Sequence, residues 1–93
     1  MPGDIEFDWD ECNIRRLARH KITPREFEEL LLNDPLDLEY QTEGGEERYE
    51  SLGATRNGRM LIAVWTIYRG KIRAVTAYPA TRPYKQLYRE YER

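Results

Sequence analysis

Five basic side chains in the second half of the chain have the chemistry needed to bind a phosphate group. They are Arg56, Arg59, Lys71, Arg73 and Arg82. Guanidinium groups keep their charge at every relevant pH and bind phosphate oxygens through two parallel hydrogen bonds. Such a cluster can bind RNA, and it can stabilise the dianionic phosphorane formed when a ribose 2′-hydroxyl attacks the adjacent phosphate without a metal. We expect several of these side chains to converge at one end of a sheet, and the nuclease interpretation depends on that pocket.

His20 is the only histidine, and its ordinary pKa lies nearest to neutral pH, so it is the candidate for proton transfer. A positioned acid or base adds about 10²–10⁴-fold to a rate. A histidine near a helix C-terminus is also stabilised by the helix dipole, and from the residue alone this structural role is favoured. For Arg56 and Arg59 the alternative is protection of a strand edge by charge.

The sequence predicts no metal site and no cofactor. One histidine and one cysteine, without paired spacing, make no transition-metal motif. Glu46, Glu47 and Glu50 could hold a hard cation, but the glutamates of a loop are more often simply hydrated. The chain also has no glycine-rich phosphate loop and no nucleophile elbow.

The net charge of −2 conceals a strong asymmetry along the 93 residues. Residues 1–55 carry six basic against fifteen acidic side chains, whereas residues 56–93 carry nine against two. The basic half suits a polyanion and the acidic half suits a basic partner, although chance clustering of surface charge explains the asymmetry as well. The length fits one small domain, residues 1–93.

The cysteine usage and the apolar runs bear on the location of the protein. The single cysteine, Cys12, excludes an internal disulfide and fits a reducing compartment. No apolar run is long enough to span a bilayer, and the acidic segment 1–8 is unlike a secretory signal. We therefore expect a cytoplasmic protein with no membrane partner.

The segment Arg48–Tyr78 is predicted to form three antiparallel strands joined by two tight turns. Asn57-Gly58 tolerates the positive φ that both central positions of a type I′ turn require, and the second turn, Arg69-Gly70, has a glycine for one unusual dihedral. The middle strand is apolar almost throughout, so it should be central and covered on both faces for part of its length.

Two helices are predicted before the meander. Asp8 is the expected N-cap of the first helix, which should end near His20, and a short strand is expected before it. Thr23 caps the second helix, with Glu26 closing the capping box, and the helix should end at Asn33 because a proline follows two residues later.

The remaining segments complete an α+β arrangement. Leu36–Tyr40 alternates like a strand, and Gln41–Glu47 is predicted to be a mobile loop. A last helix should begin at Thr81, with Tyr84, Leu87, Tyr88 and Tyr91 on one face. We therefore predict two N-terminal helices packed on an antiparallel sheet of about four strands, followed by a C-terminal helix.

The order and spacing of short motifs over nearly the whole chain resemble the BrnT family of type II toxin–antitoxin toxins. The motifs are Phe7-Asp8-Trp9-Asp10, Arg19-His20, Phe27-Glu28-Glu29, Asp34-Pro35-Leu36, Glu46-Glu47-Arg48-Tyr49 with Gly53, Trp65-Thr66, Ile72-Arg73 and Ala80-Thr81-Arg82. The resemblance implies a RelE-like ribonuclease fold and a metal-independent endoribonuclease. It also implies a cognate antitoxin with a ribbon-helix-helix DNA-binding part, through which the pair binds its operator DNA.

The resemblance also assigns site residues. The family-like positions are His20, Glu47, Arg48, Arg73 and Arg82. Of these, the predicted catalytic residues are His20, Glu47, Arg73 and Arg82, and Arg48 joins Lys21, Arg56, Arg59 and Lys71 as a predicted RNA-phosphate ligand. Tyr78 stands where family members usually have an arginine, and Lys21 stands where they usually have a glycine. The alternatives are therefore a RelE-fold binding module that has lost nuclease activity, and a protein-interaction domain with no nucleic-acid role.

Overall fold

The computed structural model describes residues 5–92, which form three helices and five strands. In chain order these are β1 (Phe7–Asp8), α1 (Glu11–Ala18), α2 (Pro24–Leu32), β2 (Leu36–Glu43), β3 (Glu46–Ala54), β4 (Met60–Tyr68), β5 (Lys71–Pro79) and α3 (Arg82–Glu92). Within this described range no helix has the length and apolar character needed to cross a membrane. The α+β class is as predicted.

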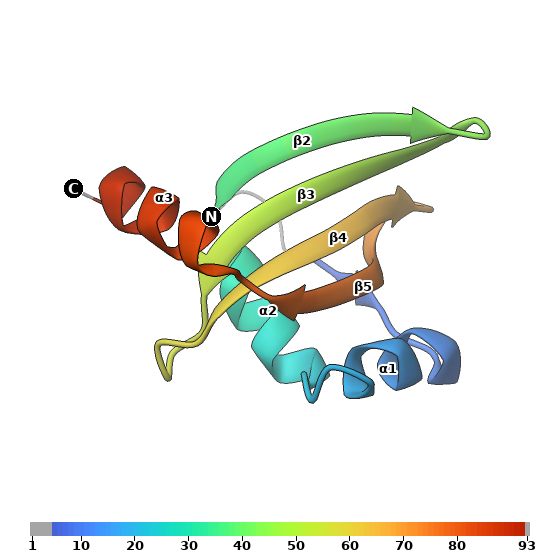
Figure 1. The fold of residues 1–93 in the computed structure, drawn as a ribbon. Coiled ribbons are helices and arrows are strands. Elements are labelled where there is room, and N and C mark those ends of the chain that lie inside the picture. The colour runs from blue at the N-terminus through green and yellow to red at the C-terminus, as the bar shows by residue number, and fades with distance from the viewer. Residues whose placement is uncertain (1–4, 93) are drawn as a thin grey trace.

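The five strands form one mixed sheet in the order β1-β5-β4-β3-β2 (Figure 1). Strands β2 to β5 form an antiparallel meander, whereas β1 pairs with β5 in parallel, placing Asp8 opposite Arg73. The prediction of about four antiparallel strands is therefore wrong in strand number and in the orientation of one pair. Alternation predicts the opening strand but not its partner, because pairing between the two ends of the chain leaves no local pattern.

One of the two predicted tight turns has a different geometry, and the other is confirmed. At Asn57-Gly58 only Gly58 has positive φ (82°), so the predicted type I′ turn is wrong. The Gly58 amide donates to the Thr55 carbonyl (2.9 Å) and the Arg59 amide donates to Thr55 Oγ1 (3.1 Å), which closes a longer loop. Positive φ at both central positions occurs instead at Arg69-Gly70, at 53° and 80°.

The segment predicted as a mobile loop is a hairpin. β2 continues to Glu43 and β3 begins at Glu46, so that only Gly44-Gly45, both with positive φ, remain between the strands. The prediction failed because this end of the hairpin is polar on both faces and lacks the alternation that identifies a half-buried strand.

The first helix begins later than predicted, and the second begins as predicted. Asp10, not Asp8, accepts the hydrogen bond from the Asn13 amide (2.9 Å), and the Asn13 side chain accepts one from the Asp10 amide (2.9 Å). At α2 the predicted capping box of Thr23 and Glu26 is confirmed by reciprocal bonds of 3.0 and 3.1 Å.

α1 and α2 cover one face of the sheet. Leu17 of α1 and Phe27 and Leu30 of α2 are fully buried against Leu61 of β4. A glycine at position 53 of β3 lets α2 lie this close, because a Cβ on Gly53 would stand only 3.0 Å from Leu30 Cγ. This core holds α1 beside β5 and α2 across β3 and β4.

α3 covers one end of the opposite face. Tyr88 packs against Leu52 of β3 and Ile62 of β4, so the apolar middle strand is covered on both faces near its start. The other members of the predicted apolar stripe, Tyr84, Leu87 and Tyr91, remain 40–41 % exposed. Beyond α3 this face of the sheet is uncovered.

Candidate nucleic-acid interface

The uncovered part of the sheet face opposite α1 and α2 is here called the open face. Because side chains alternate along a strand, Arg48 and Glu50 share this face with Leu52, which packs beneath α3. On β5, Ile72 packs into the core under the N-terminal helices, so its neighbour Arg73 projects onto the open face. The open face therefore carries charged side chains from two different strands.

Arg48 and Arg73 lie in one row across the open face, on either side of Thr66. Thr66 pairs with Arg73, and the pairing of Tyr49 with Trp65 places Arg48 level with Thr66. Two strand spacings of about 4.8 Å put the two arginine Cα atoms about 10 Å apart. Their long side chains can therefore approach one phosphate group from two sides.

Arg73 is fixed by two carboxylates at the start of the chain. Its Nη1 donates to Asp8 at 2.8 Å and its Nη2 donates to Asp10, and these bonds, that to Asp10 first, raise the pKa of Arg73. The guanidinium also lies 5.7 Å from the centre of the Tyr68 ring. Arg73 thus ties β1 and the start of α1 to β5, with much of its charge compensated.

This ion pair makes stability depend on acidity. The backbone hydrogen bond from Asn13, and next the hydrogen bond from Arg73, hold the pKa of Asp10 below its ordinary value of 3.8. Since the unfolded chain binds that proton more readily, the contribution to stability is complete above about pH 4 and is lost as the pH falls further. Asp10→Asn keeps a good N-cap but removes the charge, so its urea midpoint should fall less on acidification than that of the wild type. Parallel pH curves for the two proteins would contradict this assignment.

Arg48 has an unused hydrogen-bond donor. Its Nη2 contacts Glu46 at 3.4 Å, but its Nε is buried and has no hydrogen-bond partner among the described residues. A buried N–H without a partner is unfavourable, because it has lost water without gaining an acceptor. An anion bound on the open face would supply that acceptor.

Arg48 has a carboxylate on each side of it along the open face, Glu46 and Glu50, and the sequence did not single out Glu50 for catalysis. Glu47, which it did, is adjacent to Arg48 in the strand and so points to the opposite face. Glu47 nevertheless borders a hollow of about 670 Å³ at the end of β4 that Thr66 and Arg73 of the open face also line. The period-two alternation from Arg48 was the signal that could have identified Glu50.

His20 and Tyr78 lie together at the β5 edge of the open face. Their ring centres are 6.3 Å apart, His20 is exposed and Tyr78 is half-buried. Burial, and then the nearby Glu50 carboxylate, raise the pKa of Tyr78, so its phenol stays protonated. Tyr78 therefore stands between the histidine and the glutamate that face the same surface.

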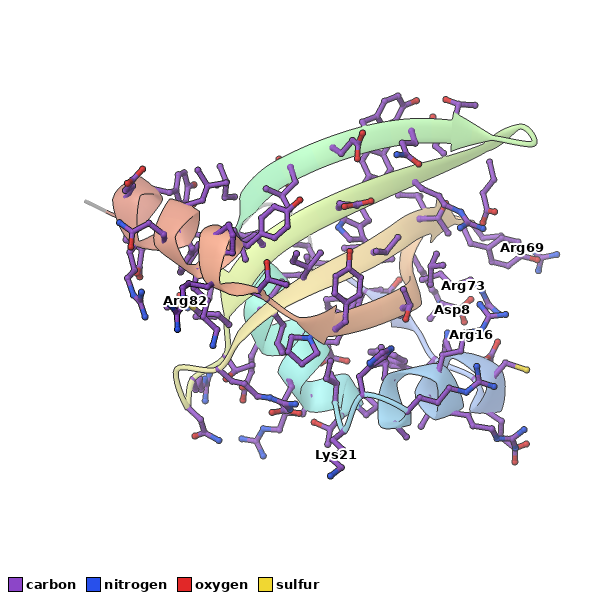
Figure 2. The ribbon with its side chains drawn as sticks, viewed as in Figure 1. Asp8, Arg16, Lys21, Arg69, Arg73 and Arg82 are labelled. Carbon is purple, nitrogen blue, oxygen red and sulfur yellow. The ribbon has the colours of Figure 1, made fainter. Side chains whose placement is uncertain are left out.

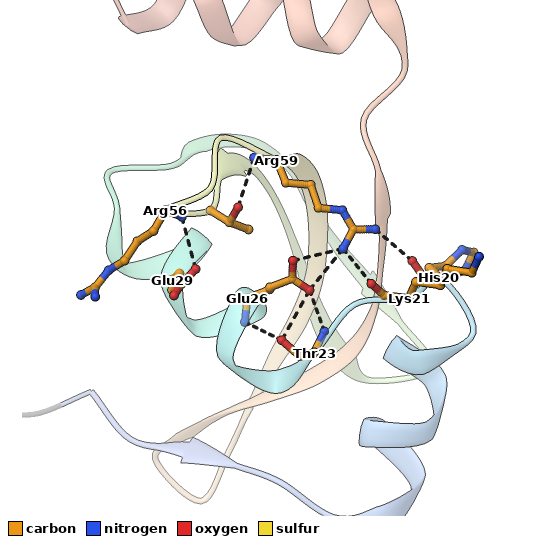
Figure 3. Close-up of polar contacts among 8 residues, drawn as sticks. His20, Lys21, Thr23, Glu26, Glu29, Arg56 and Arg59 are labelled. Atoms are coloured by element: carbon orange, nitrogen blue, oxygen red, sulfur yellow. Dashed lines mark hydrogen bonds and ion pairs between the residues drawn. The ribbon is translucent and has the colours of Figure 1, made fainter.

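Arg59, a predicted phosphate ligand, is already bound within the protein (Figure 3). Its Nη1 donates to the Lys21 carbonyl at 2.7 Å and to both Glu26 oxygens at 3.1 and 3.2 Å, and its Nη2 donates to the His20 carbonyl at 3.3 Å. Lys21 has φ of 58°, which directs the chain between α1 and α2 past this guanidinium. Arg59 fastens the β3–β4 loop to the junction of the two helices.

The predicted basic residues do not form one cluster. Lys21, Arg56 and Arg59 line a hollow near the β3–β4 loop, whereas Lys71 and Arg73 belong to the beginning of β5 at the other end of the strands. Figure 2 shows Arg82 beside the first turn of α3 and Arg73 at the far end of the sheet. The expectation that these side chains converge is therefore wrong, because the first turn of the meander and the start of its last strand lie at opposite ends.

Histidine, cysteine, aspartate and glutamate side chains make no group of three or more that could hold a metal ion, within the residues that the structure describes. The acidic residues weighed for a hard cation are divided by strand alternation, with Glu47 facing away from Glu50.

The comparison with known families is decisive for the class of protein. The family model for the BrnT ribonuclease toxin of type II toxin–antitoxin systems matches residues 9–83. The chain belongs to the BrnT family. No curated protein matches it. The matched range contains both N-terminal helices, strands β2 to β5 and the beginning of α3.

Membership in the BrnT family brings an antitoxin partner and an RNA target. Of the family-like positions, Arg48 and Arg73 share the open face and His20 lies at its edge. Glu47 lies on the opposite face and Arg82 at the opposite end of the sheet. The BrnT surface that combines cationic, carboxylate and titratable side chains is thus the open face.

Proposed function

We propose that this BrnT protein is an endoribonuclease toxin that cuts RNA on its open face without a metal, by attack of a 2′-hydroxyl on the adjacent phosphate. The observation that carries the proposal is the row in which Arg48 and Arg73 flank Thr66, with Glu50 next to Arg48 on the same face. Family membership supports it independently. The proposal no longer depends on the five-residue cluster expected from the sequence.

Each side chain has a role in this proposal. Arg48 binds the scissile phosphate and stabilises the extra charge of the phosphorane, while Arg73, fixed by its carboxylates, orients the same group. Glu50 accepts the 2′-hydroxyl proton. A water molecule from solvent gives a proton to the departing 5′-oxygen, because His20 lies beside Tyr78, five residues along β5 from Arg73, and in this proposal contacts the RNA strand away from the cut. The P–O bond to the 5′-oxygen breaks as the bond to the 2′-oxygen forms, so the products carry a 2′,3′-cyclic phosphate and a 5′-hydroxyl.

The other predicted site residues act on parts of the RNA away from the cut in this proposal. Lys71 lies at the same end of β5 as Arg73, and Glu47 lines the neighbouring hollow, where its carboxylate can accept hydrogen bonds from a base. Lys21, Arg56 and Arg82 lie at the other end of the sheet. In the cytoplasm a cognate antitoxin with a ribbon-helix-helix part neutralises the toxin and alone contacts the operator DNA.

The test is cleavage of a structured RNA by purified protein in excess EDTA, with analysis of the product ends. We expect fragments ending in 2′,3′-cyclic phosphate, and growth arrest when the protein is expressed without an antitoxin. Intact RNA together with unimpaired growth would reject the nuclease.

A second candidate function is a non-catalytic module that binds the antitoxin or RNA and regulates its operon. It is favoured by the carboxylates that already engage Arg59 and Arg73, and by Tyr78 in place of the usual arginine. Tyr78→Arg distinguishes the two, since a large gain of cleavage in an otherwise inactive protein would identify the natural chain as this module. Unchanged strong cleavage in both proteins would exclude it.

A further inference from the structure

A second group of basic side chains surrounds the start of β4 and the middle of α3. A hollow of about 290 Å³ there is lined by Gly58, Arg59, Met60, Pro79, Lys85 and Arg89. Lys85 and Arg89 are four residues apart on α3 and so lie on the same side of the helix. None of the residues that line this hollow is acidic.

Lys85 and Arg89 supply the uncompensated charge of this surface. The ion pairs between described residues engage Arg59 with Glu26, but none involves Lys85 or Arg89. Arg59 also lines a neighbouring hollow of about 460 Å³ with Lys21, Arg25 and Arg56, in which the carboxylates of Glu26 and Glu29 offset part of the positive charge. Five basic side chains of the two hollows are together called the distal surface here, namely Lys21, Arg56, Arg59, Lys85 and Arg89.

The distal surface is separated from the open-face row by the length of β5. Arg73 lies near the start of β5 and Pro79 at its end, and six residues of extended chain span about 20 Å. Tyr78 and its neighbour His20 stand on the same strand next to Pro79, on the side of the distal surface that faces the open-face row. Two aromatic rings between two basic surfaces are a combination typical of sites for single-stranded nucleic acid, in which bases stack and phosphates bind cations.

We propose that the distal surface binds the phosphate backbone of the same RNA strand whose scissile phosphate lies on the open face. The inference rests on the proposed function and extends it, because it assigns Lys85 and Arg89 to substrate binding. The strand runs along the β5 edge, so an RNA must be long enough to cover both surfaces to gain the second set of contacts. These contacts are to phosphates and carry no sequence preference.

The test compares Lys85→Gln/Arg89→Gln with the control Arg15→Gln/Arg19→Gln. The control removes the same charge at the same four-residue spacing from two exposed arginines of α1 and its C-terminal end, outside both hollows. Binding of a 2′-O-methyl oligouridine dodecamer, which cannot be cut at its modified riboses, is measured as a function of salt. Loss of two phosphate contacts should make the slope of log affinity against log salt shallower by about 1.4, since each contact on a single strand contributes about 0.7.

Cleavage of an RNA trimer, which cannot span both surfaces, should be the same in the wild type and in the Lys85/Arg89 variant. Two results would overturn the proposal that the distal surface binds RNA. One is a salt slope of the Lys85/Arg89 variant equal to that of the control, and the other is a loss of trimer cleavage as large as its loss of cleavage of longer RNA. Weakened binding of duplex DNA with unchanged binding of the RNA dodecamer would also overturn it, and would assign the surface to DNA.

The outcomes also separate this inference from the proposed function. If the wild type binds and cuts RNA, and Arg48→Gln weakens both, but the Lys85/Arg89 variant behaves like its control, only the distal surface is rejected. If the wild type neither binds nor cuts any RNA, both proposals are rejected. Thermal unfolding of each variant checks that the fold is retained.

Discussion

Arg48→Gln is expected to lower the rate of RNA cleavage by about 10²–10³-fold, the usual effect of removing one donor that stabilises a developing anion. Arg48 is the arginine on the open face with a buried Nε that lacks a partner among the described residues. Its contact with Glu46, at 3.4 Å, is long and partly exposed, so the guanidinium can turn to a phosphate at little loss. The measurement is the single-turnover rate with a short labelled RNA.

The matched control is Arg15→Gln, which removes an equal charge from an exposed side chain on α1. The control should cut RNA at the wild-type rate. We also expect Arg48→Gln to unfold at the same urea concentration as the wild type or slightly higher, because it removes a buried donor that the protein leaves unpaired. Near-normal cleavage by Arg48→Gln would remove Arg48 from the site, and a strongly lowered midpoint would make it a structural residue.

Local signals in the sequence were sufficient for most of the helices and strands, but not for the site. The Thr23 and Glu26 box at α2 and the apolar middle strand are determined by residues close in sequence, and both were predicted. The turn at Asn57-Gly58 was not predicted correctly. The Thr55 hydroxyl accepts a hydrogen bond from the Arg59 amide and so stabilises a longer loop than the two-residue turn that Asn-Gly favours. A single side chain outside the dipeptide changed the geometry.

The sequence alone could have shown which candidate residues share a sheet face and which lie at opposite ends of the strands. Strand alternation separates Glu47 from Glu50, and the antiparallel order places Arg59 and Arg73 at opposite ends, both from sequence alone. The partners of Arg73 could not be found in this way, since Asp8 pairs with it across nearly the whole chain. Contacts between residues so far apart depend on tertiary packing, which produces no periodic pattern in the sequence.

Arg59→Met is expected to lower the free energy of unfolding by about 1.5–3 kcal/mol, the range for hydrogen bonds that involve a charged group. The reason is that Arg59 joins the β3–β4 loop to the carbonyls of His20 and Lys21 and to the Glu26 carboxylate. Methionine is also a long side chain but donates no hydrogen bond. The loss of unfolding free energy is therefore due to the missing hydrogen bonds and not to a cavity. Urea unfolding followed by circular dichroism measures it.

The pH dependence of this loss tests the Glu26 part of the contact. Burial opposes ionisation of Glu26, yet the Thr23 amide and the Arg59 guanidinium outweigh it and hold the pKa of Glu26 below its ordinary value of 4.5. The ion pair therefore stabilises the fold fully above about pH 4.5 and progressively less as the pH falls, so the gap between wild type and Arg59→Met should narrow in acid. Trimer cleavage by the folded variant should remain, because Arg59 lies outside the open face. If Arg59→Met is as stable as the wild type but cleaves the RNA trimer poorly, Arg59 binds phosphate, as its residue type alone predicts.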